Sequence, residues 1–194
     1  MKIKYPNPSV TNTRTVNEIP NGNHGMMFEN ALNTTNEYYR IHNKAIIYKK
    51  PTPIQVVRVD YPSRSAAKIV EAYYRTPSTT DYNGIYKGKY IDYEAKETIH
   101  NSFAFKHIFP HQIKHLVEVD KMGGIAFVII YYKKVNKVVI IDIKEFVKLY
   151  NDGYDNDKRK SLPVEVALKI GREAKLGFTP PISYLDAVDE LYKL

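Results

Sequence analysis

Hydrophobic positions along this chain follow two different spacings, and together they predict a mixture of helices and strands. Within 25–42, four residues recur at intervals of three or four and share one helical face: Phe28, Leu32, Thr35 and Tyr39. The segments 125–132 and 137–141 are almost entirely apolar, which is typical of central strands buried on both faces. The pattern therefore predicts an α/β fold.

Shorter signals complete the predicted order of elements. Further strands are expected at 45–48, 54–59, 85–86 and 90–98. Further helices are expected at 110–122, 143–150, 163–174 and 183–194. A tight hairpin is expected around Lys87-Gly88-Lys89. The segment 65–74 is ambiguous, because its alanines and glutamate favour a helix whereas its two tyrosines favour a strand.

The first 22 residues differ from the remainder of the chain. They are rich in Asn, Pro and Thr and show no hydrophobic periodicity. We expect them to form a flexible arm. A single domain is expected over 23–194, because that length is sufficient for one hydrophobic core.

The charge of the chain indicates a polyanionic partner. The formal net charge is +8 over 194 residues, and such a basic protein typically binds nucleic acid or an anionic surface. From Lys44 to Arg75, seven basic residues stand against two acidic ones, a net charge of +5. A solvated surface is the plain alternative for that segment. Its position just before a carboxylate cluster favours the nucleic-acid interpretation.

Composition also excludes several classes of protein. The chain has no cysteine, so disulfides and thiolate metal sites are excluded and any metal must be held by oxygen or imidazole ligands. The longest apolar run, Ile125 to Tyr132, is too short to cross a bilayer. No apolar stretch follows the basic start of the chain, so we expect no secretory signal and a cytoplasmic location.

The segment 90–97 carries the candidate chemistry. In a strand, alternate residues share a face, so Asp92, Glu94 and Lys96 are expected on one side, opposite a core-facing side. A hairpin would also bring Asp81 beside Glu94. Magnesium prefers hard oxygen ligands such as these two carboxylates. A nearby lysine can stabilise the charge that develops on a phosphate under attack. The alternative is a solvated strand face with alternating charges.

Several runs of this chain match one known family. They are Lys50-Pro51-Thr52-Pro53-Ile54-Gln55, Tyr61-Pro62-Ser63-Arg64-Ser65-Ala66-Ala67, Ser78 to Gly88, Tyr90 to Thr98, His111-Gln112-Ile113 and Ile182-Ser183-Tyr184. Through these runs the chain resembles the RecU-type Holliday junction resolvases of Gram-positive bacteria, from about Gly25 to the C-terminus.

The resemblance implies a fold, a site and an activity. The fold is restriction-endonuclease-like, with a mixed central sheet flanked by helices and a protruding stalk. The implied metal is Mg²⁺, for which Mn²⁺ can substitute, held by Thr79, Asp81, Glu94 and Gln112, with Lys96 stabilising the transition state. With Asp81 and Glu94 also catalytic, a homodimer would cut two opposed strands of a four-way DNA junction symmetrically.

The stalk implied by the resemblance coincides with the basic segment, at about 60–75. Lysines and arginines there would neutralise phosphates without reading sequence, and Tyr73 or Tyr74 would stack on an opened base. Core packing is the alternative for both tyrosines. The residues expected to contact DNA are Lys50, Arg58, Arg64, Lys68, Tyr73 and Arg75.

Two positions near the N-terminus bear on the implied site, and one pair of histidines has the spacing of a metal site. The family pattern has an arginine where this chain has His24, which weakens any phosphate contact there. Glu29 fits the family and could lie near the metal, or it could be an ordinary surface glutamate. His111 and His115 have the spacing of zinc ligands on a helix. However, Gln112 lies between them where a metalloprotease has glutamate, so zinc chemistry is not supported.

Three functions remain open from the sequence. The first is a junction-resolving nuclease of recombination and repair, with other recombination proteins as further partners. The second is a non-catalytic protein that only binds or bridges DNA junctions. The third is a nuclease of the same fold that acts on another DNA substrate. The set formed by Asp81, Glu94 and Lys96 favours the first and third, because a pure binder gains nothing from acids placed near phosphate.

Overall fold

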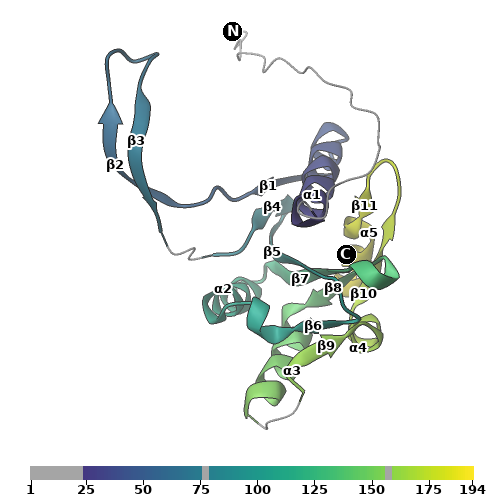
Figure 1. Cartoon of the computed structure of the whole chain (residues 1–194). Coiled ribbons are helices and arrows are strands. Elements are labelled where there is room, and N and C mark those ends of the chain that lie inside the picture. The colour runs from purple at the N-terminus through teal and green to yellow at the C-terminus, as the bar shows by residue number, and fades with distance from the viewer. Residues whose placement is uncertain (1–23, 76–78, 156–158) are drawn as a thin grey trace.

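The computed structural model describes residues 24–75, 79–155 and 159–194. The expected flexible arm at 1–22 lies outside these ranges. The body is built on a seven-stranded mixed sheet with the order β1-β4-β5-β7-β8-β10-β11 (Figure 1). Its strands are β1 Ala45–Lys49, β4 Tyr82–Tyr86, β5 Lys89–Thr98, β7 Ile125–Tyr132, β8 Lys137–Asp142, β10 Arg172–Leu176 and β11 Ile182–Ser183.

Helices cover both faces of this sheet. They are α1 His24–Ile41, α2 Pro110–Lys121, α3 Ile143–Asp155, α4 Val164–Ile170 and α5 Tyr184–Tyr192. The helices α1 and α5 pack on one face of the sheet, and α2, α3 and α4 pack on the other. The α/β class with a mixed central sheet flanked by helices is confirmed.

The central strands are hydrophobic because both of their faces are covered. Along β7, alternate side chains enter the two cores, with Phe127 and Ile129 on the α1 side and Val128 and Ile130 on the α2 side. The strand pairs in parallel with β5 and antiparallel with β8. The predicted central strands at 125–132 and 137–141 are therefore confirmed.

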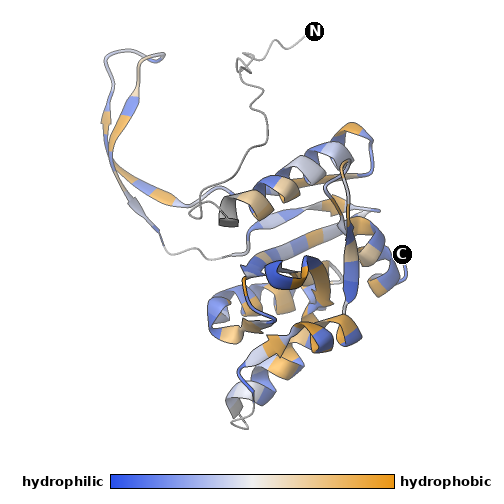
Figure 2. Cartoon of the chain, turned by 45° about the vertical axis from the view of Figure 1, so that its right-hand side comes forward, coloured by the Kyte–Doolittle hydropathy of each residue, from blue (hydrophilic) through white to orange (hydrophobic). Residues whose placement is uncertain are grey.

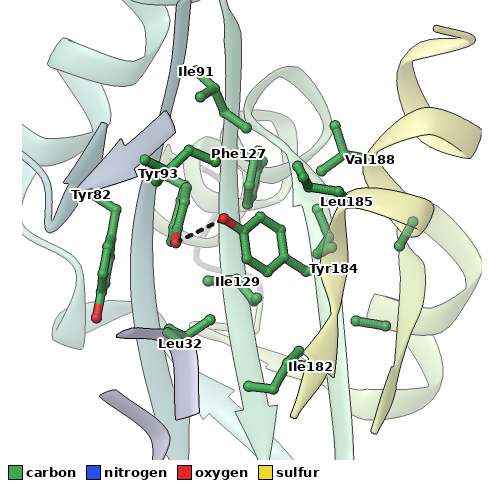
Figure 3. Close-up of a cluster of buried hydrophobic side chains, with 14 of the residues drawn as sticks. Leu32, Tyr82, Ile91, Tyr93, Phe127, Ile129, Ile182, Tyr184, Leu185 and Val188 are labelled. Atoms are coloured by element: carbon green, nitrogen blue, oxygen red, sulfur yellow. Dashed lines mark hydrogen bonds between the residues drawn. The ribbon is translucent and has the colours of Figure 1, made fainter. Parts of the chain in front are cut away.

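Stacked aromatic rings fix the strand β5 in the sheet. The ring of Tyr93 lies between those of Tyr82 and Phe127, with centroids 4.8 Å away on each side. Figure 3 shows these rings beside Tyr184, whose hydroxyl lies 3.4 Å from that of Tyr93. Because such packing leaves little freedom, the polar residues on the opposite face of β5 are held in a fixed place.

A two-stranded hairpin projects from the body, and we call its residues 54–74 the stalk. It consists of β2 Ile54–Asp60 and β3 Lys68–Tyr74, paired antiparallel (Figure 1). The ambiguous segment 65–74 is thus mainly strand, and the projection starts at Ile54, before the expected Asp60. Figure 2 shows apolar and polar residues interleaved along both strands. Since almost every stalk residue is exposed, neither face of the stalk has a core.

One predicted helix is too long. The segment 163–174 was expected to be helical throughout, but α4 ends at Ile170 and β10 starts at Arg172. The reason is tertiary: β10 pairs with β8, and Ala174 is buried in the sheet. Gly171 permits the turn because a Cβ there would lie 2.3 Å from the Ile140 carbonyl oxygen.

Short elements complete the fold. A second two-stranded sheet joins β6 Ser102–Ala104 to β9 Ser161–Pro163. Two short 3-10 helices are η1 Phe105–His107 and η2 Lys133–Val135. Within the parts of the chain that the structure describes, no helix is both long and apolar enough to cross a membrane.

Candidate active site

The hairpin of β4 and β5 brings Asp81 to Glu94. Tyr82 pairs with Tyr93 in the antiparallel register, so the residues just outside this pair, Asp81 and Glu94, face each other across the two strands. The Asp81 carboxylate accepts a hydrogen bond of 3.1 Å from the backbone N–H of Ala95. The hairpin and this convergence were both predicted from the sequence, and both are confirmed.

Glu94 is a fully buried carboxylate with unequal oxygens. Its Oε1 accepts a 2.7 Å hydrogen bond from Nε2 of Gln112 and lies 2.5 Å from Nζ of Lys96. Its Oε2 is buried and has no hydrogen-bond partner among the described residues. Burial, together with the nearby charge of Asp81, raises the pKa of Glu94 to about 8, although Lys96 acts to lower it.

This arrangement fits a divalent cation. An unpartnered buried oxygen, next to a second carboxylate that repels it, is stabilised by a shared positive ion. No group of three or more acidic, histidine or cysteine side chains that could hold a metal occurs in the described ranges. Two carboxylates are nevertheless sufficient for magnesium, which keeps several of its waters. Thr79 and Gln112 line a hollow together with Asp81.

Gln112 has a different orientation from the one that direct metal ligation needs. Its amide nitrogen donates to Glu94, while its Oε1 accepts a 3.0 Å hydrogen bond from the backbone N–H of Phe109. In this arrangement Gln112 orients the Glu94 carboxylate. Its oxygen would reach a cation only after the side chain had rotated.

An open cleft of about 560 Å³ gives access to this group. Asp81, Lys96 and Glu29 line it, and Glu29 forms a 2.5 Å ion pair with Lys49. Glu29 therefore lies in the same cleft as Asp81. The cleft is also lined by residues that were not among the candidate site residues, namely Lys49, Lys106, His107 and Phe109. Lys49 had a sequence signal, as part of the basic segment.

The residues expected to contact DNA are divided between the stalk and its base. Arg58, Arg64 and Lys68 are exposed on the stalk. Tyr73 and Tyr74 are 62% and 84% exposed, so core packing is wrong for both. Arg75 follows β3, with its guanidinium 3.4 Å from the side-chain oxygen of Gln55.

Lys50 is placed differently from the other five. Its side chain is only 17% exposed, and its ammonium lies 2.8 Å from Asp92. Asp92 itself is completely buried between the sheet and α2. Asp92, Glu94 and Lys96 share one face of β5 as expected, but the face is not solvated at Asp92 and Glu94, because helix α2 covers it.

The two histidines at zinc-like spacing separate in the structure. Nε2 of His115 lies 3.0 Å from the Asp92 carboxylate. The His111 ring stacks on Phe109, with centroids 5.7 Å apart. His24 belongs to the first turn of α1.

Comparison with known proteins gives consistent matches. The profile of a family described as RecU, recombination protein U, matches residues 23–190. A Holliday junction resolvase RecU of Geobacillus sp. (strain WCH70) is 46% identical over 199 residues, which cover 99% of this chain and 98% of the relative. A Holliday junction resolvase RecU of Pediococcus pentosaceus is 44% identical, covering 98% of each chain.

A solved structure gives a weaker match. It is Hjc of Archaeoglobus fulgidus, described as a Holliday junction resolvase from an archaeal hyperthermophile. It is 12% identical, with a TM-score of 0.46, over 77% of this chain and 95% of that chain. This likeness is too low to support a conclusion about the site.

Proposed function

Because the chain belongs to the RecU, recombination protein U, family, we propose that it is a Holliday junction resolvase that cuts two opposed strands of a four-way DNA junction. The observation that carries this proposal is the convergence of Asp81 and Lys96, which line one open cleft, on the buried carboxylate of Glu94. An acidic pair beside a lysine on a central hairpin is also what we expect of a restriction-endonuclease-like nuclease. The proposed role is in homologous recombination and DNA repair, in the cytoplasm.

Each side chain at the site has a separate role in phosphodiester hydrolysis. Asp81 and Glu94 would hold Mg²⁺, or Mn²⁺ in its place, with oxygen from Thr79 and, after rotation, from Gln112. When bound, the cation supplies charge neutralisation and makes a water molecule more acidic. Lys96 keeps a positive charge at the cleft, where it can stabilise the oxygens of a phosphate under attack. Glu29 faces the same cleft and is a candidate additional acid.

The stalk supplies affinity for the junction. Arg58, Arg64 and Lys68 are exposed along a narrow projection, where each can neutralise a backbone phosphate. Tyr73 presents an exposed ring on which a base can stack. With Arg75 at the end of β3, these contacts recognise the shape of the DNA and not its sequence.

A homodimer accounts for paired cuts. One chain carries one cleft, whereas resolution requires breaks in two strands. An isologous dimer places two equal sites about a two-fold axis, which matches the symmetry of a four-way junction. Other recombination proteins are further expected partners.

Labelled four-way junction, incubated with the full chain and Mg²⁺, tests the proposal directly. We expect paired symmetric cuts, and much slower cutting of a linear duplex of matched sequence. Glu94→Gln and Lys96→Met should each reduce cutting by about a hundredfold or more while junction binding is retained. Lys89→Met, on the same strand but exposed and outside the cleft, should cut normally.

Each of the other outcomes selects a different function. Binding without any product would make the chain a junction-bridging protein. Equal cutting of junction and duplex would make it a nuclease of another substrate. Normal cutting by either site variant would show that the cleft is not the active site.

A further inference from the structure

Asp92 lies at the centre of a polar network that the proposed chemistry does not use. Its carboxylate is 0% exposed, although the residue stands only two positions before Glu94. Donors from separate parts of the chain surround it: Lys50 Nζ at 2.8 Å, Tyr90 OH at 2.9 Å, His115 Nε2 at 3.0 Å, and the hydroxyl of Thr80. Because a buried carboxylate is destabilising unless it is paired, these donors are what allow Asp92 to be buried.

Asp92 is not placed as another metal ligand. Each of its oxygens already contacts a donor, and one of these donors is the Lys50 ammonium. A cation bound there would meet the positive charge of that ammonium. The carboxylate therefore binds protein groups, and through them it joins separate parts of the chain.

Two of the partners of Asp92, Lys50 and Thr80, lie in the segments that connect the stalk to the body. We call the segment before β2, which begins at Lys50, the outward leg, and the segment after β3, which includes Thr79, Thr80 and Asp81, the returning leg. Lys50 directly follows β1 and precedes the prolines of the outward leg. On the returning leg, Arg75 donates a 3.0 Å backbone hydrogen bond to Pro53, and the described chain resumes at Thr79. Thr80 follows at once. Asp92 thus binds one residue from the outward leg and one from the returning leg.

The returning leg also carries two of the proposed metal ligands, Thr79 and Asp81. Thr80 stands between Thr79 and Asp81, so whatever holds Thr80 holds both of them. Lys50 strengthens this link twice, because its ammonium donates to the Thr80 hydroxyl at 2.8 Å and its backbone N–H donates to the Asp81 carbonyl at 2.7 Å. The base of the stalk and one half of the metal site are therefore one hydrogen-bonded unit.

We propose that Asp92 is a positioning residue that clamps both legs of the stalk through Lys50 and Thr80 and thereby sets Thr79 and Asp81 against Glu94. The clamp ties the part of the protein that meets junction DNA to the part that binds the metal. It rests on the proposed function, because it explains how two ligands of that same site are positioned. Lys50, expected to contact phosphate, acts here through Asp92.

Thr80 offers a matched pair of variants to test the clamp. Thr80→Val keeps the shape of the side chain and removes the hydroxyl, whereas Thr80→Ser keeps the hydroxyl. Mn²⁺ alone is titrated into each metal-free full chain without DNA, and free Mn²⁺ is measured by electron paramagnetic resonance. We expect Thr80→Val to bind Mn²⁺ about 10- to 100-fold more weakly, and Thr80→Ser to bind within about threefold of the unchanged protein.

Three results would overturn the clamp. One is unchanged Mn²⁺ affinity in Thr80→Val, and another is an equal loss in both Thr80 variants. If Thr80→Val does not fold, as judged by circular dichroism, Lys50→Met is compared with Lys44→Met, which removes an exposed lysine at the other end of β1. Weaker Mn²⁺ binding by Lys50→Met alone supports the clamp, and normal binding by both variants is the third contrary result.

Junction cleavage by the unchanged protein separates the two proposals. If the unchanged chain fails to cut the junction, the proposed function is wrong. If the unchanged chain cuts the junction, but loss of the Thr80 hydroxyl or of the Lys50 ammonium leaves Mn²⁺ affinity unchanged, the clamp alone is wrong.

Discussion

At the scale of single residues, the cost of burying Glu94 is the main feature of the site. The carboxylate is fully buried, one oxygen lacks a partner among the described residues, and its pKa is raised to about 8 by burial and by Asp81. An acid in this condition is stabilised by a proton or by a cation. The fold thus keeps Glu94 in place to bind a metal, and the metal-free protein is less stable as a result.

This burial predicts how the stability of the metal-free protein changes with pH. Because the pKa is higher in the folded state, at about 8, than the ordinary value of 4.5, the folded protein binds more protons between these limits. The free energy of unfolding should therefore fall as pH rises from about 5 to 8, by at most about 1.4 kcal/mol per pH unit from this group. Denaturant unfolding of the protein at several pH values, with a chelator present to remove metal, measures this free energy.

Glu94→Gln is the control, because glutamine has the same shape and does not titrate. The free energy of unfolding of the unchanged protein should therefore fall with pH more steeply than that of Glu94→Gln. Parallel curves for the two proteins would contradict the prediction. Mg²⁺ requires the deprotonated carboxylate. It should therefore raise the melting temperature of the unchanged protein more at pH 8 than at pH 6, and raise that of Glu94→Gln little at either pH.

At the scale of elements, the β4–β5 hairpin decides whether the site can form. Its turn residues Lys87 and Gly88 have φ values of 47° and 73°, as a tight two-residue turn between antiparallel strands requires. On β4, Gly84 allows β1 to approach, since a Cβ there would lie 1.9 Å from the Ile46 carbonyl oxygen. One glycine serves the turn and the other serves the pairing of strands.

Alanine at these two glycines should have unequal effects on stability. Gly88→Ala meets no atom within 4 Å, so it should cost only the strain of a positive φ, about 1–2 kcal/mol. Gly84→Ala forces the backbone of β1 away and should cost about 3 kcal/mol or more. Urea unfolding of both variants makes the comparison. Equal losses would show that the close approach of β1 is not needed.

The stalk should govern the salt dependence of junction binding. Replacing Arg64 and Lys68 with glutamine should lower affinity and reduce the slope of log affinity against log salt by about one unit per lost phosphate contact. Melting should hardly change, because both side chains are exposed. Lys148→Gln with Lys169→Gln, on α3 and α4 away from the stalk (Figure 1), removes the same charge. An equal change of slope in this control would contradict a special role for the stalk.

At the scale of the whole molecule, the proposed dimer predicts how many strands one assembly can cut. The chain has a mass of 22.5 kDa, so sedimentation should give twice that mass. A dimer purified with one unchanged chain and one Glu94→Gln chain, each with a different affinity tag, should nick a junction once and leave it unresolved. Paired cuts from this mixed dimer would show that a single cleft can make both breaks.

The sequence by itself determined most of the helices and the central strands of the body, and the meeting of Asp81 with Glu94. Both depend on local properties. Hydrophobic periodicity marks the faces of α1 and β7, and a short turn at Lys87-Gly88 leaves little choice of register. The family was likewise recognisable from runs of adjacent residues, because those runs carry the chemistry.

Only the tertiary structure decided which groups are buried and what each one contacts. The strand β10 formed where a helix was predicted, because pairing with β8 outweighs local propensity. Helix α2, which follows β5 after a connecting segment, covers the face of β5 that carries Asp92 and Glu94 and turns a charged strand face into a buried site. Lys50 likewise binds Asp92, 42 positions away. Burial and pairing at such separations depend on packing of the whole chain, which no local spacing encodes.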